Sequence, residues 1–338
     1  TSGSTGVPKG VMIEHGSLFN YLNWANDEYI RGEECPMALF TSIAFDLTIT
    51  SIFLPLISGN ILNVYVSEEQ GLLVQRVITE GKVKVIKLTP AHLKIVYESN
   101  IELVGIKRII VGGEQFEANL AREVFNRGNG NIEIYNEYGP TEATVGCILY
   151  KYNPDTQGQR SSLLIGKPVI NSSIYILDSQ LRLLPFGSVG EIYIGGAQLF
   201  RGYVSSVDQT NQRLICNPYN QGDLIYRTGD LARWLPDGNI EFLGRIDNQV
   251  KIRGFRIELG EIDNQLSRHE LVKTSIVDVK EKAGDKYLVA YYVSTQKSEI
   301  KELHEYMSIR LPAYMLPLHY VYMDSIPLTP NGKIDRKR

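Results

Sequence analysis

The chain has 338 residues, of which 43% are hydrophobic and 22% charged, and its formal net charge is −3. This length predicts two domains, and the apolar content is ample for a packed interior. The slight negative charge argues against a nucleic-acid-binding protein. The three cysteines are far apart in the sequence, which argues against a disulfide scaffold and a C-x-x-C zinc site. Neither a signal-peptide pattern nor an apolar run of membrane length is found in the sequence, which predicts cytoplasmic localisation.

The first ten residues form a run rich in glycine and hydroxyl side chains, Thr1-Ser2-Gly3-Ser4-Thr5-Gly6-Val7-Pro8-Lys9-Gly10. Glycines let the backbone approach an anion closely, hydroxyls and free N–H groups donate to phosphate oxygens, and Lys9 adds a positive charge. The run therefore predicts a phosphate-binding loop, although it does not match the P-loop pattern. The alternative is a flexible Gly/Ser linker.

The next part of the chain alternates between helical and strand patterns. A helix is predicted over 18–29 with Ser17 as its N-cap, followed by a strand over 83–88, a helix over 90–98, a strand over 107–111, a helix over 119–125 and a strand over 132–135. This β-α-β-α-β order predicts a parallel sheet with ligands at the carboxyl ends of its strands. We therefore expect a site at Lys87, 111–114 and 136–142.

The remaining elements have a different character. Strands over 173–177, 190–194 and 240–243 are separated by turn residues, which predicts an antiparallel, β-barrel-like region. A helix over 261–268, strands over 275–279 and 287–293, a helix over 299–309 and a strand over 320–323 then predict a small α+β domain of about 90 residues. The predicted fold class is α/β.

Four short runs carry groups suited to chemistry. The segment 136–142 combines an aromatic ring, a hydroxyl and a carboxylate suited to Mg²⁺, and 226–230 is predicted to be a turn whose Asp230 can accept from ribose hydroxyls. Simpler interpretations remain open, namely a plain strand-to-helix turn and a capping aspartate. The cations of 244–254 are typical of a solvated face, and Lys333 lies in a predicted tight turn that is most often only a surface feature.

Taken in order, these runs resemble the core motifs of the adenylation domains of nonribosomal peptide synthetases, in the adenylate-forming superfamily of acyl- and aryl-CoA synthetases and luciferases. The resemblance extends over the whole chain and rests on eight segments: 1–10, 45–46, 136–142, 190–202, 226–231, 244–263, 311–317 and 331–336. One departure is that the family has a substantial stretch before the phosphate loop, whereas this sequence starts at the loop.

The resemblance implies that ATP and an amino acid form an aminoacyl-adenylate, whose acyl group passes to the phosphopantetheine thiol of a carrier protein. It implies Thr141, Glu142 (with Mg²⁺) and Lys333 as catalytic residues, and Asp247 as the hinge between a large part, 1–246, and a small mobile part, 247–338. A condensation domain and an MbtH-like protein are further candidate partners. The nucleotide-binding set implied by the resemblance is Ser2, Gly3, Thr5, Lys9, Gly113, Asn136, Tyr138, Asp230, Phe242, Arg245 and Lys251.

The resemblance also implies an amino-acid pocket, in which Asp46 pairs with the α-amino group of the substrate. The side-chain pocket then comprises Leu47, Thr50, Lys87, Ile110, Gly112, Glu137, Val145 and Gly146. A carboxamide fits the two opposite charges of Lys87 and Glu137, since its carbonyl accepts from the lysine and its NH₂ donates to the glutamate, so L-asparagine is the expected substrate. The alternative is that the two charges neutralise each other beneath another small side chain.

Two other classes of protein compete with this interpretation. A stand-alone acyl- or aryl-CoA synthetase of the same superfamily is the first, and Asp46 argues against it because acids without an α-amine have no use for that carboxylate. The second is a non-enzymatic binding fragment. An aspartate-activating domain is a further alternative for the substrate.

Overall fold

A computed structural model gives the structure of the chain, and it describes residues 9–66, 70–158, 160–246, 249–282, 285–294 and 300–325. Of the expected site residues, Ser2, Gly3, Thr5, Asp247 and Lys333 lie outside these ranges. The described residues divide into two compact units, a large one over residues 10–246 and a small one that groups Lys9 with the residues from 249 onward. The predicted domain boundary at residues 246 and 247 is close to this division, although its role as a hinge stays a prediction.

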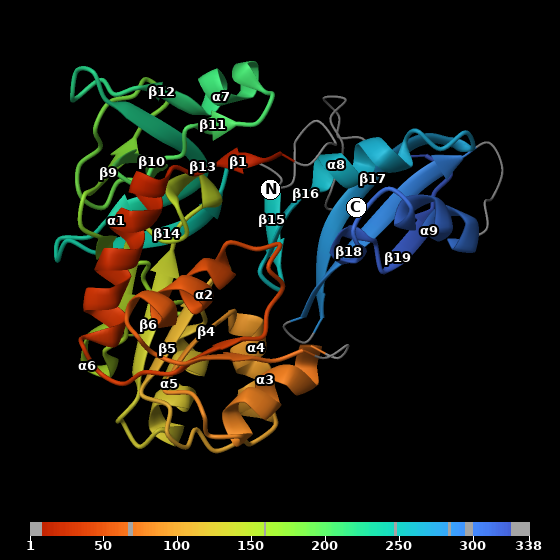
Figure 1. Cartoon of the computed structure of the whole chain (residues 1–338). Helices are drawn as coiled ribbons and strands as arrows, with labels where there is room; N and C mark the ends of the chain where they lie inside the picture. Colours follow the sequence, from red (N-terminus) through yellow and green to blue (C-terminus); the bar gives the residue numbers. More distant parts are fainter. Residues whose placement is uncertain are drawn as a thin grey trace. The chain divides into compact units, whose positions relative to one another are not determined.

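A seven-stranded sheet is the centre of the large unit (Figure 1). In spatial order its strands are β3 (Leu62–Val64), β2 (Met37–Leu39), β4 (Val85–Leu88), β5 (Arg108–Gly112), β6 (Glu133–Tyr138), β7 (Ile148–Lys151) and β8 (Lys167–Pro168). Five strands run parallel to one another, β7 pairs antiparallel with the fifth of them, and β8 pairs antiparallel with β7. The predicted parallel sheet is confirmed in β4, β5 and β6, and the segments expected to carry the site include the carboxyl-terminal residues of these strands.

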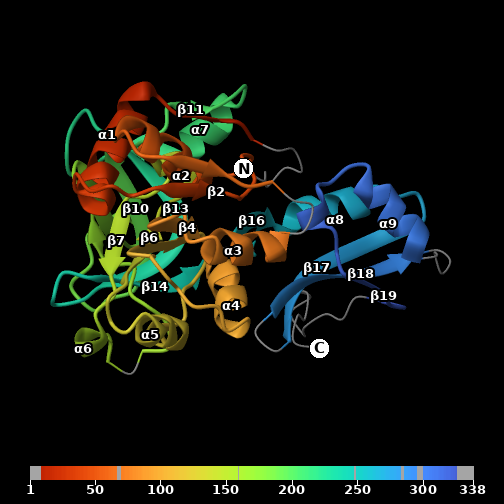
Figure 2. The same cartoon turned by 60° about the horizontal axis from the view of Figure 1, so that its bottom comes forward.

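Helices cover both faces of this sheet. Helices α3 (Gln70–Thr79), α4 (Pro90–Glu98) and α5 (Ala118–Arg127) lie side by side on one face (Figure 2), where they share a core with Ile86, Ile109 and Ile134. Helices α1 (His15–Ala25) and α2 (Leu47–Ile57) pack with Val85, Ile110 and Tyr135. Since neighbouring residues of a strand point to opposite faces, α1 and α2 cover the other face.

The first helix differs from its prediction. It begins after Glu14, and the Ser17 hydroxyl donates to the Leu199 carbonyl at 3.0 Å, so Ser17 is not the N-cap. The helix also changes form after Ala25, because a wider π-helical turn, η1 (Asn26–Ile30), continues it until Arg31 adopts a left-handed conformation with φ of 57°. Helix α4 starts as predicted, with Thr89 as a side-chain cap and Pro90 as its first residue.

The second sheet of the large unit is antiparallel, as predicted for this region. Its five strands are β9 (Ser172–Leu177), β10 (Gly190–Gly196), β12 (Leu214–Cys216), β13 (Leu224–Trp234) and β14 (Ile240–Arg245), with β1 (Val11–Met12) and β11 (Gly202–Tyr203) forming a separate pair. The predicted turn over 226–230 is wrong, because these residues lie inside β13. Within the strand, Gly229 adopts a left-handed conformation with φ of 79°, which glycine tolerates. Short helices η2 (Thr141–Ala143), α6 (Pro154–Gln157) and α7 (Val207–Arg213) complete this unit.

The small unit has its own hydrophobic core and the predicted α+β content. A hairpin of β15 (Gln249–Ile252) and β16 (Phe255–Glu258) occupies most of the predicted cationic run. A three-stranded sheet follows, in the order β17 (Val272–Lys282), β18 (Asp285–Ser294) and β19 (His319–Tyr322), with α8 (Leu259–Leu266), α9 (Ile300–Ser308) and η3 (Ala313–Met315). Within the described ranges, no helix has the length and apolar character needed to cross a bilayer.

Candidate active site

The strand register brings Lys87 and Glu137 to the same face of the large sheet. Lys87 shares the face of Val85 in β4, and Glu137 shares that of Tyr135 in β6, so both point toward α1 and α2. Between them runs β5, whose Gly112 is paired in register with Glu137. A side chain at Gly112 would place its Cβ 3.0 Å from the Glu137 carbonyl oxygen, so a small residue here allows this close approach.

A buried polar cluster forms where these strands meet the helices. Lys87 makes an ion pair with Oε1 of Glu137, and its Nζ also donates to Thr50 Oγ1 at 2.8 Å and to the Tyr21 hydroxyl at 3.1 Å. Tyr29 donates to Oε2 of Glu137 at 2.6 Å. The three ammonium protons of Lys87 thus have partners within the protein, and the cluster is electrically neutral and closed to water.

Burial dominates the electrostatics of this cluster. Tyr21, Tyr29 and Thr50 have no exposed surface, and the side chains of Lys87 and Glu137 are each 2% exposed. Burial, and then the charge of Glu137, raise the pKa of both Tyr21 and Tyr29 well above the ordinary value. Both hydroxyls therefore stay protonated and can act as donors to the carboxylate over the whole physiological pH range.

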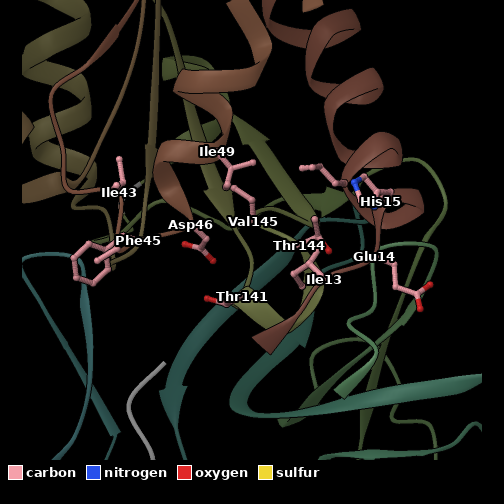
Figure 3. A pocket seen from close by; sticks show the side chains of 12 residues that line it. Ile13, Glu14, His15, Ile43, Phe45, Asp46, Ile49, Thr141, Thr144 and Val145 are labelled. Atoms are coloured by element: carbon pink, nitrogen blue, oxygen red, sulfur yellow. The ribbon is translucent and has the colours of Figure 1, made fainter. Parts of the chain in front are cut away.

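A cavity of about 250 Å³ lies in the large unit (Figure 3). Three of the expected site residues line it, namely Asp46, Thr141 and Val145. Figure 3 shows Phe45 and Glu14 at opposite ends, with Asp46 and Thr141 between them. The complete lining is Ile13, Glu14, His15, Leu18, Ile43, Ala44, Phe45, Asp46, Ile49, Thr141, Thr144 and Val145.

An apolar layer separates the cavity from the charged cluster. Leu18, Ile49 and Val145 line the cavity and also pack in the core that contains Tyr21 and Tyr29. Neither Lys87 nor Glu137 reaches the cavity surface, although the sequence led us to expect both as pocket walls. In the structure they contact each other directly, which is the arrangement considered as the alternative.

The loop after β6 shows backbone strain beside the cavity. Thr144 and Val145 have φ of 52° and 72°, a left-handed conformation that β-branched residues rarely adopt. The Thr144 hydroxyl donates to the Gln198 carbonyl at 2.7 Å, which helps to hold this conformation. Strain of this kind persists where the surrounding structure enforces it, and functional sites are frequent examples.

Gly146, which follows, determines where the Glu137 carboxylate lies. A Cβ at this position would be 2.5 Å from Cδ of Glu137, and the carboxylate has no room to move because its partners surround it. We expect Gly146→Ala to lower the free energy of unfolding by about 1–3 kcal/mol through overpacking. Urea unfolding measures this effect, with Gly16→Ala as the control because a Cβ there meets nothing within 4 Å. An unchanged midpoint for Gly146→Ala would contradict the packing.

A second cluster gathers the residues expected to bind the nucleoside. Asp230 in β13 pairs in register with Arg245 in β14, whose guanidinium donates to Oδ1 at 2.6 Å. The Tyr138 hydroxyl donates to Oδ2 of Asp230 at 2.5 Å, and the ring centroids of Tyr138 and Phe242 are 6.2 Å apart. Burial, followed by the charge of Asp230, raises the pKa of Tyr138. The structure therefore brings together an aromatic pair, a fixed carboxylate and a cation.

The other expected residues are distributed more widely. Glu142 is 1% exposed and accepts from the Tyr203 hydroxyl at 2.6 Å, while the Asn136 amide donates to the Leu164 carbonyl at 2.8 Å. No group of three or more His, Cys, Asp or Glu side chains suited to a metal occurs in the described part of the chain. Glu142 fits Mg²⁺ only as a single carboxylate ligand, with phosphate oxygens and water completing the shell, which is a usual arrangement for this ion.

Leu47, Ile110, Gly113, Lys9 and Lys251 complete the expected set. Leu47 is the first residue of α2, Ile110 is fully buried in β5, and Gly113 follows β5 with φ of 91°. Lys9 precedes the large unit, and Lys251 lies in β15 of the small unit.

The structure adds residues that the sequence analysis missed. His15 lines the cavity, and no pattern in the sequence pointed to it. Tyr21 and Tyr29 belong to the buried cluster. Both lie on the predicted helix over 18–29, and a buried tyrosine hydroxyl requires a hydrogen-bond partner.

Comparisons with known proteins identify the family. The sequence profile of the AMP-binding enzymes matches residues 1–204, and that of the AMP-binding enzyme C-terminal domain matches residues 261–333. Tyrocidine synthase 3 of Brevibacillus parabrevis is 47% identical over 339 residues, which cover 100% of this chain and 5% of the synthase. The chain thus spans about a twentieth of the length of that relative.

Two solved structures share the fold. The Vibrio cholerae adenylation domain AlmE, in complex with glycyl-adenosine-5'-phosphate, is 22% identical with a TM-score of 0.89 over 99% of this chain and 64% of that chain. NpsA-ThdA from Klebsiella oxytoca, an artificially fused adenylation–PCP di-domain, is 25% identical with a TM-score of 0.80 over 93% of this chain and 58% of that chain. This chain belongs to the AMP-binding enzyme family of ATP-dependent, AMP-forming ligases, as an adenylation domain of the nonribosomal peptide synthetase type.

Proposed function

We propose that the chain activates an amino acid for nonribosomal peptide synthesis. The substrate carboxylate attacks the α-phosphorus of ATP, the bond to the β-phosphate breaks, and an aminoacyl-adenylate and pyrophosphate result. The observation that carries this proposal is that the Asp46-lined cavity and the Tyr138–Asp230–Arg245 cluster lie in one compact unit. Thr141 and Tyr138, which belong to the same segment, connect the two.

The described residues suit distinct parts of the two substrates. Asp46 supplies a negative charge for the α-ammonium group, which a simple carboxylic acid lacks. Tyr138 and Phe242 offer aromatic faces to adenine, and Asp230, fixed by its two donors, accepts from the ribose hydroxyls. Mg²⁺ at Glu142 supplies charge neutralisation to the phosphates when it is bound.

The roles of Lys333 and Asp247 complete the proposal and rest on the motif resemblance. Lys333 neutralises the charge that develops as the carboxylate meets the α-phosphate. Asp247 is the hinge for the change between adenylate formation and thioester formation. The Klebsiella oxytoca neighbour is an adenylation–PCP fusion, which supports a carrier protein as the partner that receives the acyl group.

Within this function, L-asparagine is the substrate that the charges favour. The Lys87–Glu137 pair lies beneath the apolar lining of the cavity, so a substrate side chain reaches it only by displacing part of that lining. Because the pair is neutral, a carboxamide in that position can exchange hydrogen bonds with both charges without adding net charge. An aspartate side chain would add a buried negative charge next to Glu137, which is unfavourable in a site of low dielectric. A hydrocarbon side chain would leave the closed pair undisturbed, and this remains the competing possibility.

Amino-acid-dependent ATP–pyrophosphate exchange tests this assignment. We expect asparagine to give the highest kcat/KM among Asn, Asp, Gln and Leu. Glu137→Gln removes the repulsive charge, so the Asn/Asp ratio should fall by roughly tenfold or more. Preference of the parent for Leu or Asp would contradict the asparagine assignment, and the absence of exchange with every amino acid would contradict amino-acid activation itself.

A further inference from the structure

Tyr29 is not among the predicted site residues, but its hydroxyl donates to Glu137, whose charge is part of the proposed substrate specificity. It is fully buried and donates to Oε2 of Glu137 at 2.6 Å. The Tyr21 hydroxyl is 3.3 Å from both carboxylate oxygens, a weaker approach. Lys87 occupies Oε1, so each oxygen of Glu137 has a different principal donor.

The π-helical turn η1 explains how Tyr29 reaches this position. The buried residues Ser17, Tyr21, Ala25 and Tyr29 recur at intervals of four. In a regular α-helix such positions drift by about 40° per step, whereas a π-turn has more residues per turn and reduces the drift. The wider turn therefore keeps Tyr29 on the inward face, below Tyr21. π-Turns of this kind are often associated with functional sites.

We propose that Tyr29 is a specificity-determining positioning residue, which acts through Glu137 to make the site reject a substrate carboxylate. This inference rests on the proposed function. By donating to Oε2, Tyr29 holds Glu137 as a fixed anion that can only accept hydrogen bonds. In that state Glu137 accepts from a carboxamide N–H and repels a carboxylate. Without the hydroxyl, a buried carboxylate oxygen loses its principal donor, and the carboxylate is held less firmly in this orientation.

The alternative is that Tyr29 only fills the core, and the chain offers a matched residue that separates the two roles. Tyr135 is also fully buried, belongs to the same core and contacts the Tyr29 ring edge-on, with the centroids 5.2 Å apart. Its hydroxyl, however, accepts from the Arg31 guanidinium at 2.5 Å rather than donating to Glu137. Removal of either hydroxyl by Phe keeps the ring and changes only the polar contact.

The test compares kcat/KM for Asn and Asp in ATP–pyrophosphate exchange for the parent, Tyr29→Phe and Tyr135→Phe. We expect Tyr29→Phe to lower the Asn/Asp ratio by about tenfold, as for the loss of a hydrogen bond to a charged group, without a change in the KM for ATP. Tyr135→Phe should leave the ratio as in the parent. Because Tyr29 acts through Glu137, adding Tyr29→Phe to Glu137→Gln should give no further change in the ratio.

The outcomes distinguish this inference from the substrate assignment. Suppose that the parent prefers asparagine. The inference about Tyr29 is then wrong, and the proposed function stands, if Tyr29→Phe keeps the parent's Asn/Asp ratio of kcat/KM or if Tyr29→Phe and Tyr135→Phe lower that ratio equally. Additive effects of Tyr29→Phe and Glu137→Gln would show that Tyr29 does not act through Glu137. If the parent instead prefers another neutral amino acid, the asparagine assignment is wrong, and the ratio of that substrate to aspartate measures the role of Tyr29.

Discussion

Replacing Lys87 by methionine is expected to lower the free energy of unfolding by about 3–5 kcal/mol. Methionine keeps most of the side-chain volume, so the loss arises from the charge rather than from a cavity. The substitution leaves the Glu137 carboxylate buried without its cation, and it removes the donor to Thr50 Oγ1 at 2.8 Å. Chemical unfolding followed by circular dichroism measures the change.

A double variant and a partly exposed lysine provide the controls. Lys87→Met combined with Glu137→Gln removes both charges, so it should be less destabilised than Lys87→Met alone. Lys84→Met removes a lysine whose partner, Glu34, is 3.6 Å away with a side chain 78% exposed, and it should change stability by less than about 1 kcal/mol. If Lys87→Met lowered the free energy of unfolding no more than Lys84→Met, the buried ion pair would not contribute to stability as the structure indicates.

Replacing Asp46 by asparagine should lower kcat/KM for the amino acid by roughly 10- to 100-fold, because a hydrogen bond to a charged group contributes about 1.5–3 kcal/mol. Asp46 lines the cavity and precedes α2, but its side chain makes no capping bond to that helix. Because asparagine is nearly isosteric with aspartate, we expect the stability of the variant to stay within about 1 kcal/mol of the parent. ATP–pyrophosphate exchange measures the activity, and thermal unfolding measures the stability.

A substrate analogue separates recognition of the α-amine from a general loss of activity. Succinamic acid has the carboxamide and the reacting carboxylate of asparagine but lacks the α-ammonium group. Exchange with this acid should be equally weak in the parent and in Asp46→Asn, whereas exchange with asparagine should fall only in the variant. Asp155→Asn, on the exposed helix α6, should leave both rates unchanged. An equal loss with both substrates would argue that Asp46 supports the cavity rather than the α-amine.

The parallel order of β4, β5 and β6 and the bounds of α4 could be predicted from the sequence alone. Both follow from local signals, since buried strands alternate with helices along the chain and a Thr89-Pro90 pair marks a helix start. The segment around Thr141 was expected from its place at the carboxyl end of a predicted parallel strand, and Asp46 from the motif resemblance alone; both line the cavity.

Only the tertiary structure decided how the buried charges are satisfied. Lys87 and Glu137 are 50 residues apart, and whether they face a substrate or each other depends on how closely β4, β5 and β6 pack. The position of Tyr29 depends on a π-turn that the residue pattern did not predict. Residues 226–230 form a strand because β10 and β14 supply their hydrogen-bond partners. Local propensity cannot decide such points, because hydrogen bonds between distant segments and the exclusion of water determine them.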